Sequence, residues 1–273
     1  FFSSRRRHTR YISVTGVQTC ALPICRGIGY ETIREFLEAG VKVMTCSRNG
    51  DQVAESCRKL AAQTGGDVRS IQADLSTAEG GKRLFEATMA EFGTVDILVN
   101  NAGTMYSGRF EELTEDGLRH QLDTKLFGWM RMIRQVYPVM REKHWGRICN
   151  LIGGAGKEPD PYMFGSGMTN SALLNLTKSL STEFAPDNVL VNAICPGWVA
   201  TDLWKRNAQG LQKELGVQSE EEARRLATRK NAMGRFGKPE ELANAIVFLC
   251  SERSSYITGI SLNTDGGRLK GLW

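Results

Sequence analysis

Short apolar segments alternate with amphipathic segments along most of the chain, and this alternation restricts the fold more than any other feature. The apolar segments are the length of buried strands, and the segments between them repeat apolar residues at helical spacing. Strands that alternate with helices predict a parallel sheet with helices on both faces. Because 273 residues suffice for one core, we predict a single α/β domain with a doubly wound (Rossmann-type) parallel sheet. Its predicted strands include residues 41–47, 68–74, 95–103, 147–152 and 189–197.

Residues 146–183 indicate where a ligand would bind. The strand at 147–152 enters a loop at Gly153 and Gly154, and we predict a helix from Pro161 onward, because proline suits the first helical turn. In a doubly wound sheet the ligand lies beyond the carboxyl ends of the strands. We therefore expect the functional site where this loop meets the helix.

Composition argues against several classes of protein. The chain has no apolar run of about eighteen residues, so we expect no membrane span. His8, His120 and His144 lack metal-ligand spacing, and the seven cysteines form no C-x-x-C pair. These features favour a reduced, cytoplasmic protein without a metal site.

Residues 1–25 differ in composition from the rest of the chain. They contain no Asp or Glu and carry four arginines, so the remaining residues have a net charge of +5 − 4 = +1 and give no reason to expect a nucleic-acid partner. The segment shares its lack of acids with transit peptides, but it more closely resembles the translation of a sequencing-library adapter. We expect a non-native or disordered leader that has replaced the first strand and its glycine-rich turn. A transit peptide and a native extension are the alternatives.

Three motifs have the composition of a nucleotide-binding site. R-G-I-G at 26–29 opens a helix, and its glycines would allow the backbone to approach a pyrophosphate at the helix N-terminus. N-N-A-G at 100–103 follows a strand, with asparagine amides to satisfy backbone groups and a glycine that admits a cofactor. P-G-x-x-x-T at 196–201 follows another strand. All three fall where strands end or helices begin.

The residues after the second predicted strand bear on the choice of cofactor. NAD-specific folds place a carboxylate there for the ribose 2′-hydroxyl. This chain has Ser47 followed by Arg48, and Arg26 lies in the glycine loop. Two guanidiniums without a carboxylate suit a 2′-phosphate. We predict NADP(H) in preference to NAD(H), with two solvated arginines at turns as the alternative.

Together these motifs, over about residues 26–267, resemble the short-chain dehydrogenase/reductase family. The resemblance implies about seven strands, a homodimer or homotetramer, and an NAD(P)(H)-dependent oxidoreductase acting on a carbonyl or alcohol. It also implies an adenine contact from Asp74, a nicotinamide contact from the Thr201 hydroxyl, and a substrate flap at about 198–233. The residues assigned to cofactor binding are Arg26, Gly27, Ile28, Gly29, Arg48, Asp74, Asn101, Ala102, Gly103, Pro196, Gly197 and Thr201.

The residues at the family's catalytic positions depart from the family pattern. The family uses a Ser after the fifth strand, a Tyr-x-x-x-Lys on the next helix and an Asn on the preceding helix. Ungapped counting places Gly153, Ser166, Asn170 and Lys125 at these positions, so lysine and asparagine are exchanged. We assign Lys125, Tyr162, Ser166 and Asn170 to catalysis, and we expect the Lys125 ammonium to point toward the nicotinamide pocket, near Asn170 and Ser166. Because a serine hydroxyl is a much weaker acid than a phenol, we expect Tyr162, one helical turn before Ser166, to be the proton donor. The alternatives are a packed aromatic for Tyr162 and a surface lysine for Lys125.

Three functions are compatible with these residues. The first is an oxidoreductase with a rearranged site, acting on a fairly apolar small molecule. The second is a catalytically inactive NADP(H)-binding sensor or subunit. The third is a lyase or isomerase on the same scaffold. The residues expected to line the substrate pocket are Met105, Met163, Phe164, Trp198 and Trp204.

Overall fold

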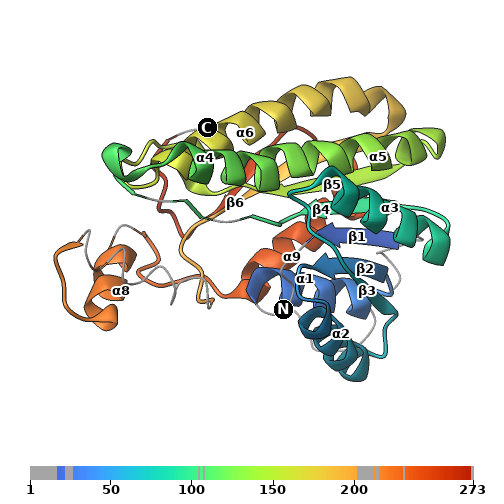
Figure 1. Cartoon of the computed structure of the whole chain (residues 1–273), viewed down its shortest axis with the longest axis horizontal. Coiled ribbons are helices and arrows are strands. Elements are labelled where there is room, and N and C mark those ends of the chain that lie inside the picture. Colours follow the sequence, from blue (N-terminus) through green and yellow to red (C-terminus); the bar gives the residue numbers. More distant parts are fainter. Residues whose placement is uncertain are drawn as a thin grey trace, which may run out of the picture.

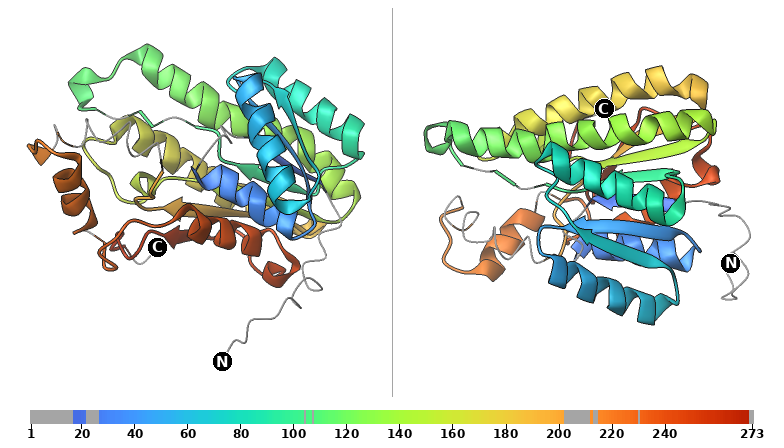
Figure 2. Two further views of the ribbon diagram at one scale, coloured as in Figure 1. Left: turned by 90° about the horizontal axis from the view of Figure 1, so that it is seen from below. Right: turned by 45° about the vertical axis from the view of Figure 1, so that its right-hand side comes forward.

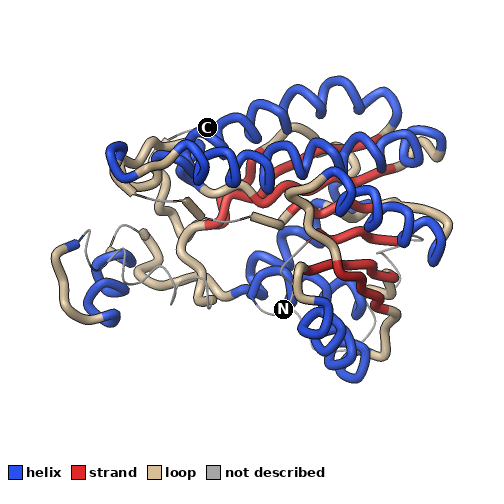
Figure 3. Tube along the Cα trace, viewed as in Figure 1, coloured by secondary structure: helices blue, strands red, loops and turns tan. Residues whose placement is uncertain are grey.

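A seven-stranded parallel sheet, in the order β3-β2-β1-β4-β5-β6-β7, forms the centre of the molecule (Figures 1 and 3). It confirms the predicted doubly wound α/β fold. The computed structural model describes the backbone of residues 17–21, and residues 27–103, 105–106, 108–201, 212, 215–229 and 231–271. The strands are β1 (Val17–Ala21), β2 (Lys42–Ser47), β3 (Val68–Gln72), β4 (Ile97–Asn100), β5 (Gly146–Leu151), β6 (Val189–Pro196) and β7 (Ser261–Thr264).

Residues Val17–Ala21 of the predicted leader form β1, so the first strand of the sheet is present and is built from leader residues. β1 pairs in parallel with β2 on one side and with β4 on the other, with Thr19 opposite both Met44 and Leu98. Backbone groups make the ladder bonds, so a short extended segment can fill this position whatever its origin. Residues 22–26, where the glycine-rich turn was expected, lie outside the described residues.

Helices cover both faces of the sheet (Figure 2). On one face, α1, α2 and α9 bury apolar side chains such as Ile33 and Leu60. On the other face, α3, α5 and α6 do the same with residues such as Leu84 and Met132. None of the described helices has the length and apolar character needed to cross a membrane. The helix bounds are α1 (Gly27–Glu38), α2 (Gly50–Thr64), α3 (Ala78–Phe92), α5 (Gly128–Glu142), α6 (Phe164–Phe184) and α9 (Pro239–Leu249).

A π-helical turn, Leu122–Phe127, joins α4 (Glu115–Gln121) to α5. The Gly128 N–H donates to the carbonyl of Asp123, five positions earlier, which widens the helix locally. Such turns are rare and often occur at functional sites. This turn carries Lys125, one of the predicted catalytic residues.

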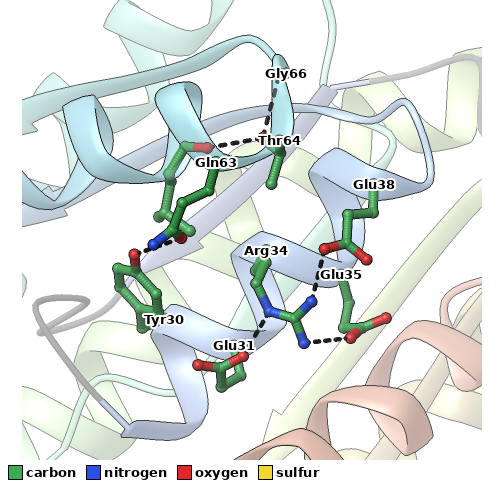
Figure 4. A network of polar contacts seen from close by, with 9 residues as sticks. Tyr30, Glu31, Arg34, Glu35, Glu38, Gln63, Thr64 and Gly66 are labelled. Atoms are coloured by element: carbon green, nitrogen blue, oxygen red, sulfur yellow. Dashed lines mark hydrogen bonds and ion pairs between the residues drawn. The ribbon is translucent and has the colours of Figure 1, made fainter.

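Polar contacts hold the outer face of α1 and connect it to α2 (Figure 4). The Tyr30 hydroxyl donates to Oε1 of Gln63 on α2 at 2.9 Å. The first turn of α1 contains no acidic residue, which leaves its N-terminal N–H groups free of a competing carboxylate. Further along the helix, Arg34 pairs with Glu31, Glu35 and Glu38 at 2.7, 2.7 and 2.6 Å.

A chain of buried hydrogen bonds links the ends of the central strands to α6. Asn100 Nδ2 on β4 donates to Asn150 Oδ1 on β5 at 2.9 Å, and Asn150 Nδ2 donates to Thr177 Oγ1 at 2.9 Å. The Thr177 hydroxyl in turn donates to the Leu173 carbonyl at 2.8 Å. The chain fixes β4, β5 and α6 relative to one another beneath the loops that follow these strands.

Replacing Thr177 with valine should destabilise the fold. The change keeps the shape of the side chain but leaves the buried amide of Asn150 without its acceptor, which should lower the free energy of unfolding by about 1–3 kcal/mol. Thr182→Val, on the exposed side of the same helix, is the matched control and should change it by less than about 0.5 kcal/mol. Denaturant titration measures both, and equal effects would contradict the role of the chain.

Candidate active site

A cavity of about 240 Å³ lies at the carboxyl ends of the strands. Its walls come from the segments after β4, β5 and β6, from the π-helical turn and from the first turns of α1 and α6. This is the ligand-binding edge of a doubly wound sheet. The lining residues are Ile28, Asn101, Gly103, Met105, Lys125, Leu151, Gly153, Gly154, Ala155, Met163, Ser166, Asn170, Pro196, Gly197, Trp198, Val199, Thr201 and Arg268.

Lys125 reaches this cavity from the π-helical turn. Its Nζ donates to Oδ1 of Asn170 on α6 at 2.7 Å, which is the contact expected from the exchange of lysine and asparagine. Gly103 leaves room for the lysine stem, since a Cβ there would lie 3.3 Å from Lys125 Cδ. The ammonium also lies 5.3 Å from the centre of the Trp129 ring. Burial lowers the pKa of Lys125 to about 8, an effect that the nearby Cys195 partly offsets.

The Asn170 amide fills the space that the absence of a side chain at Gly153 leaves open. Asn170 is buried on α6, and its Nδ2 points at the backbone of the loop after β5. A Cβ on residue 153 would lie 2.8 Å from this nitrogen, closer than such atoms normally approach. Any larger side chain at position 153 would therefore displace the amide that binds Lys125.

The Ser166 hydroxyl fixes a loop to α6. It donates to the Tyr106 carbonyl at 3.1 Å and accepts from the Tyr106 N–H at 3.0 Å. Gln121 Nε2 donates to the same oxygen at 3.3 Å. Because its proton is already given to a backbone carbonyl, Ser166 is placed to shape the cavity wall and not to donate to a ligand.

Tyr162 is absent from the described cavity lining, contrary to prediction. α6 begins at Phe164, so Tyr162 precedes the helix and shares no helical face with Ser166. Its hydroxyl accepts hydrogen bonds from Nε and Nη2 of Arg109 at 3.2 and 2.9 Å. The guanidinium also lies 4.9 Å from the centre of the ring. These contacts hold the phenol outside the cavity.

Most of the predicted cofactor residues lie at the cavity or contact it. Gly27 has a φ of +70°, which glycine adopts without strain, and a Cβ there would lie 3.1 Å from Thr201 Cγ2. Gly29 is buried in the first turn of α1. The Ala102 carbonyl accepts a hydrogen bond from Trp129 Nε1 at 2.8 Å. Those that line the cavity itself are Ile28, Asn101, Gly103, Pro196, Gly197 and Thr201.

Arg48 and Asp74 lie after β2 and β3, outside the described lining. Arg48 is exposed. The Asp74 carboxylate accepts from the backbone N–H and the hydroxyl of Ser76 at 3.0 and 2.8 Å. Burial raises the pKa of Asp74, but these hydrogen bonds and the charge of Arg48 outweigh it and lower the pKa overall. Arg26 lies outside the described residues, so its pairing with Arg48 stays a prediction.

The predicted substrate pocket is present in part. Met105, Met163 and Trp198 line the cavity. Phe164 does not: it is 39% exposed and packs edge-on against another exposed ring. Trp204 lies outside the described residues.

Residues 198–233, the predicted flap, are described at 198–201, 212, 215–229 and 231–233. They include α8 (Glu220–Thr228), which projects beyond the helices that cover the sheet (Figure 1). Ala227 of this helix packs with Phe236 against Trp198, a lining residue. The described part of the flap thus contacts the cavity wall.

Arg268 is the charged residue among the lining residues that were not predicted as site residues; the others are Leu151, Gly154, Ala155 and Val199. Arg268 follows the last strand, where no motif or periodicity marks a residue as part of a site. Among the described residues, no group of three or more His, Cys, Asp or Glu is placed to hold a metal ion.

The family described as Enoyl-(Acyl carrier protein) reductase matches residues 24–268. This chain belongs to the short-chain dehydrogenase/reductase family. It is 29% identical to the NADPH-dependent reductase BacG of Bacillus subtilis, over 90% of this chain and 95% of that protein. It is 31% identical to the 3-oxoacyl-(acyl-carrier-protein) reductase FabG of Aquifex aeolicus, over 89% and 93%. The structure of L-sorbose reductase from Gluconobacter frateurii, complexed with NADPH and L-sorbose, matches with a TM-score of 0.88 and 32% identity, over 94% of this chain and 97% of that one.

Lys125 should make the stability of the fold depend on pH in a defined direction. Its pKa is about 8 in the folded chain against an ordinary 10.5, so between these values the unfolded chain binds the proton and the folded chain does not. The stability contributed by this group therefore rises with pH across that window and is constant below it. Relative to Lys125→Met, the wild type should gain free energy of unfolding between about pH 8 and about pH 10.

Denaturant titrations at several pH values measure this difference. Lys82→Met, which removes an exposed ammonium outside the cavity lining, is the matched control. A difference between wild type and Lys125→Met that stays constant from neutral to alkaline pH would contradict a desolvated ammonium.

Proposed function

We propose that this protein is an NADP(H)-dependent oxidoreductase that interconverts a carbonyl and an alcohol through a rearranged active site. The observation that carries the proposal is the Lys125 ammonium, which lies in the cavity on Asn170 with its pKa lowered to about 8. Membership of the family and relatives whose names include NADPH-dependent reductase support the reaction class. The positions where the family has its Ser, Tyr, Lys and Asn hold Gly153, Ser166, Asn170 and Lys125 in this chain.

The residues around the cavity fit a dinucleotide. The N-terminus of α1 faces no acid in its first turn, and Gly27 leaves the backbone there uncovered, as a diphosphate requires. Asn101, Gly103 and Thr201, which line the cavity, would hold the nicotinamide end. Arg48, exposed after β2 with no acid in the adjoining positions 47 and 49, suits the 2′-phosphate. When bound, the cofactor supplies or accepts the hydride.

Lys125 is proposed to supply the proton. A carbonyl oxygen that gains negative charge in the cavity would be stabilised by the ammonium and would then take one of its protons. An ammonium with a pKa of about 8 is protonated at neutral pH and is still acidic enough to transfer a proton efficiently. Asn170 orients the group through its Oδ1, and Ser166 holds the wall formed by residues 105–106. Tyr162 has no part in this mechanism, because Arg109 binds its hydroxyl outside the cavity.

Replacing Lys125 with methionine should abolish most turnover. Loss of a general acid costs about 10²–10⁴-fold in rate, and NADPH oxidation with a panel of aldehydes and ketones measures it. Tyr162→Phe is the matched control and should change turnover by less than about twofold, since the phenol lies outside the cavity lining. If Tyr162→Phe lost most of the turnover and Lys125→Met lost little, the phenol and not the ammonium would be the proton donor.

The rate should also depend on pH with opposite signs in the two directions. Reduction needs the protonated amine, so kcat should be level below about pH 8 and fall as the pH rises through the pKa of Lys125. Alcohol oxidation needs the neutral amine and should rise through the same range. Pre-steady-state rates measured across this range test both signs, and a level profile in both directions would contradict the assignment.

The alternative is an NADP(H)-binding sensor or an inactive subunit. It would be favoured if the wild type bound NADPH with ordinary affinity but oxidised it with no member of the carbonyl panel. The Lys125–Asn170 pair would then be a buried polar contact without a chemical role.

The preference for NADPH should depend on Arg48 and Arg26. Arg48→Ala should weaken NADPH binding by about 1.5–3 kcal/mol through the loss of a charged hydrogen bond, and should leave NADH almost unchanged. The double variant with Arg26→Ala should increase the difference between the loss of NADPH affinity and the loss of NADH affinity. Titration calorimetry with both nucleotides measures the difference, and an equal loss for both would disprove the role of the two arginines.

Two broader expectations complete the proposal. From the family we propose a homodimer or homotetramer in the cytoplasm, which light scattering and cell fractionation test. We also propose that residues 1–25 are a foreign leader, supported by their lack of acids and by a family match that begins at residue 24. A source genome that encodes the same segment would contradict this.

A further inference from the structure

Arg268 places a second cation at the cavity wall. It follows β7, where Asp265 fixes the backbone by accepting from the N–H groups of Gly267 and Leu269 at 2.9 and 2.8 Å. The tail then lies against the loop after β5, since a Cβ on Gly154 would be 3.2 Å from Leu269 Cδ1. These contacts hold the backbone on both sides of Arg268.

The guanidinium of Arg268 is incompletely paired. Its Cζ lies 5.5 Å from the centre of the Trp198 ring, a stacking contact that neutralises no charge. Its Nη2 lies 4.0 Å from Oδ2 of Asp160, at the outer limit of an ion pair, while Oδ1 of the same carboxylate accepts the Tyr162 N–H at 2.9 Å. The buried Nε of Arg268 makes no hydrogen bond. The side chain as a whole is 21% exposed, so another part of the guanidinium is open to a ligand in the cavity.

The charge of the cavity lining also favours an anionic partner for Arg268. Its described lining contains two cations, Lys125 and Arg268, and no Asp or Glu. Lys125 already donates to Asn170, and the proposed reaction assigns its ammonium to the reacting carbonyl. Arg268 is the other cation of this lining, and it lies beside Trp198 and beside Asp160 of the loop after β5.

We propose that the substrate carries a carboxylate, which Arg268 binds while Lys125 faces the reacting carbonyl. This inference rests on the proposed function and narrows it from a carbonyl compound to an oxo acid. The planar fork of a guanidinium matches the two oxygens of a carboxylate. A single, partly compensated cation suits one negative charge, whereas a phosphate carries nearly two. Trp198 supplies a flat apolar surface beside the charge for the carbon chain.

Matched acids and esters test the proposal with the full-length protein. Acetoacetate and levulinate are compared with their methyl esters, which keep the carbonyl and remove the charge. The wild type should show a lower KM for each acid than for its ester. Arg268→Met should raise KM for the acids by about tenfold or more, the effect of losing a charged hydrogen bond, and should leave both esters within about twofold. Arg58→Met on the exposed side of α2 is the matched control and should change neither.

A second variant should change KM for the acids in the opposite direction. Asp160→Asn removes the carboxylate that competes for Arg268 but retains an oxygen for the Tyr162 N–H. It should lower KM for the acids and leave the esters unchanged. A general disturbance of the loop would instead raise KM for acids and esters together, which would contradict the proposal.

The remaining outcomes separate this inference from the proposed function. Turnover of acids and esters with equal KM, or a loss of NADPH affinity in Arg268→Met, would overturn the carboxylate site and leave the reductase intact. If no compound is turned over, calorimetry of acetoacetate with the NADP⁺-saturated protein tests whether the carboxylate site exists. Binding that Arg268→Met abolishes would support the site although the reductase fails, and an absence of binding would overturn it.

Discussion

The parallel pairing of the seven strands determines where this protein can act. Because every strand runs in the same direction, all carboxyl ends lie at one edge, and segments distant in sequence meet there. The cavity lining after β4, β5 and β6 is a direct result. The arrangement depends on β1, which lies between β2 and β4 and so joins the two halves of the sheet.

Burial of an ammonium group is the second constraint. Removing the charge of Lys125 from water is unfavourable, and the hydrogen bond to Asn170 offsets only part of the cost. The same loss of hydration brings the pKa of the amine to about 8, where it exchanges protons readily near neutral pH. One physical cause therefore lowers the stability of the fold and gives the amine the acidity that the proposed reaction requires. Such an exchange of stability for reactivity is common at active sites.

Sequence periodicity was enough to predict the fold and the edge at which the site lies. The meeting of Lys125 and Asn170 was also predictable, because the family resemblance implies that these two positions belong to one relay, and Lys125 donates to Asn170 at 2.7 Å. Tyr162 was misplaced because the helix begins at Phe164, three residues after the proline, and because Arg109, more than fifty positions away, binds the hydroxyl. Arg268 was missed because only tertiary structure returns the tail after β7 to the cavity. In both cases the deciding contact is long-range and has no local pattern.

The fit between Gly153 and Asn170 limits how this site can change. A Cβ at position 153 would meet the Asn170 amide at 2.8 Å, so a serine introduced there alone would push the amide away from Lys125. A lysine introduced alone at position 170 would instead place two ammonium groups together and remove the acceptor of the first. These two single changes are therefore unfavourable unless a neighbouring residue changes with them. A designer who wished to introduce either side chain would have to alter its contact partner in the same step.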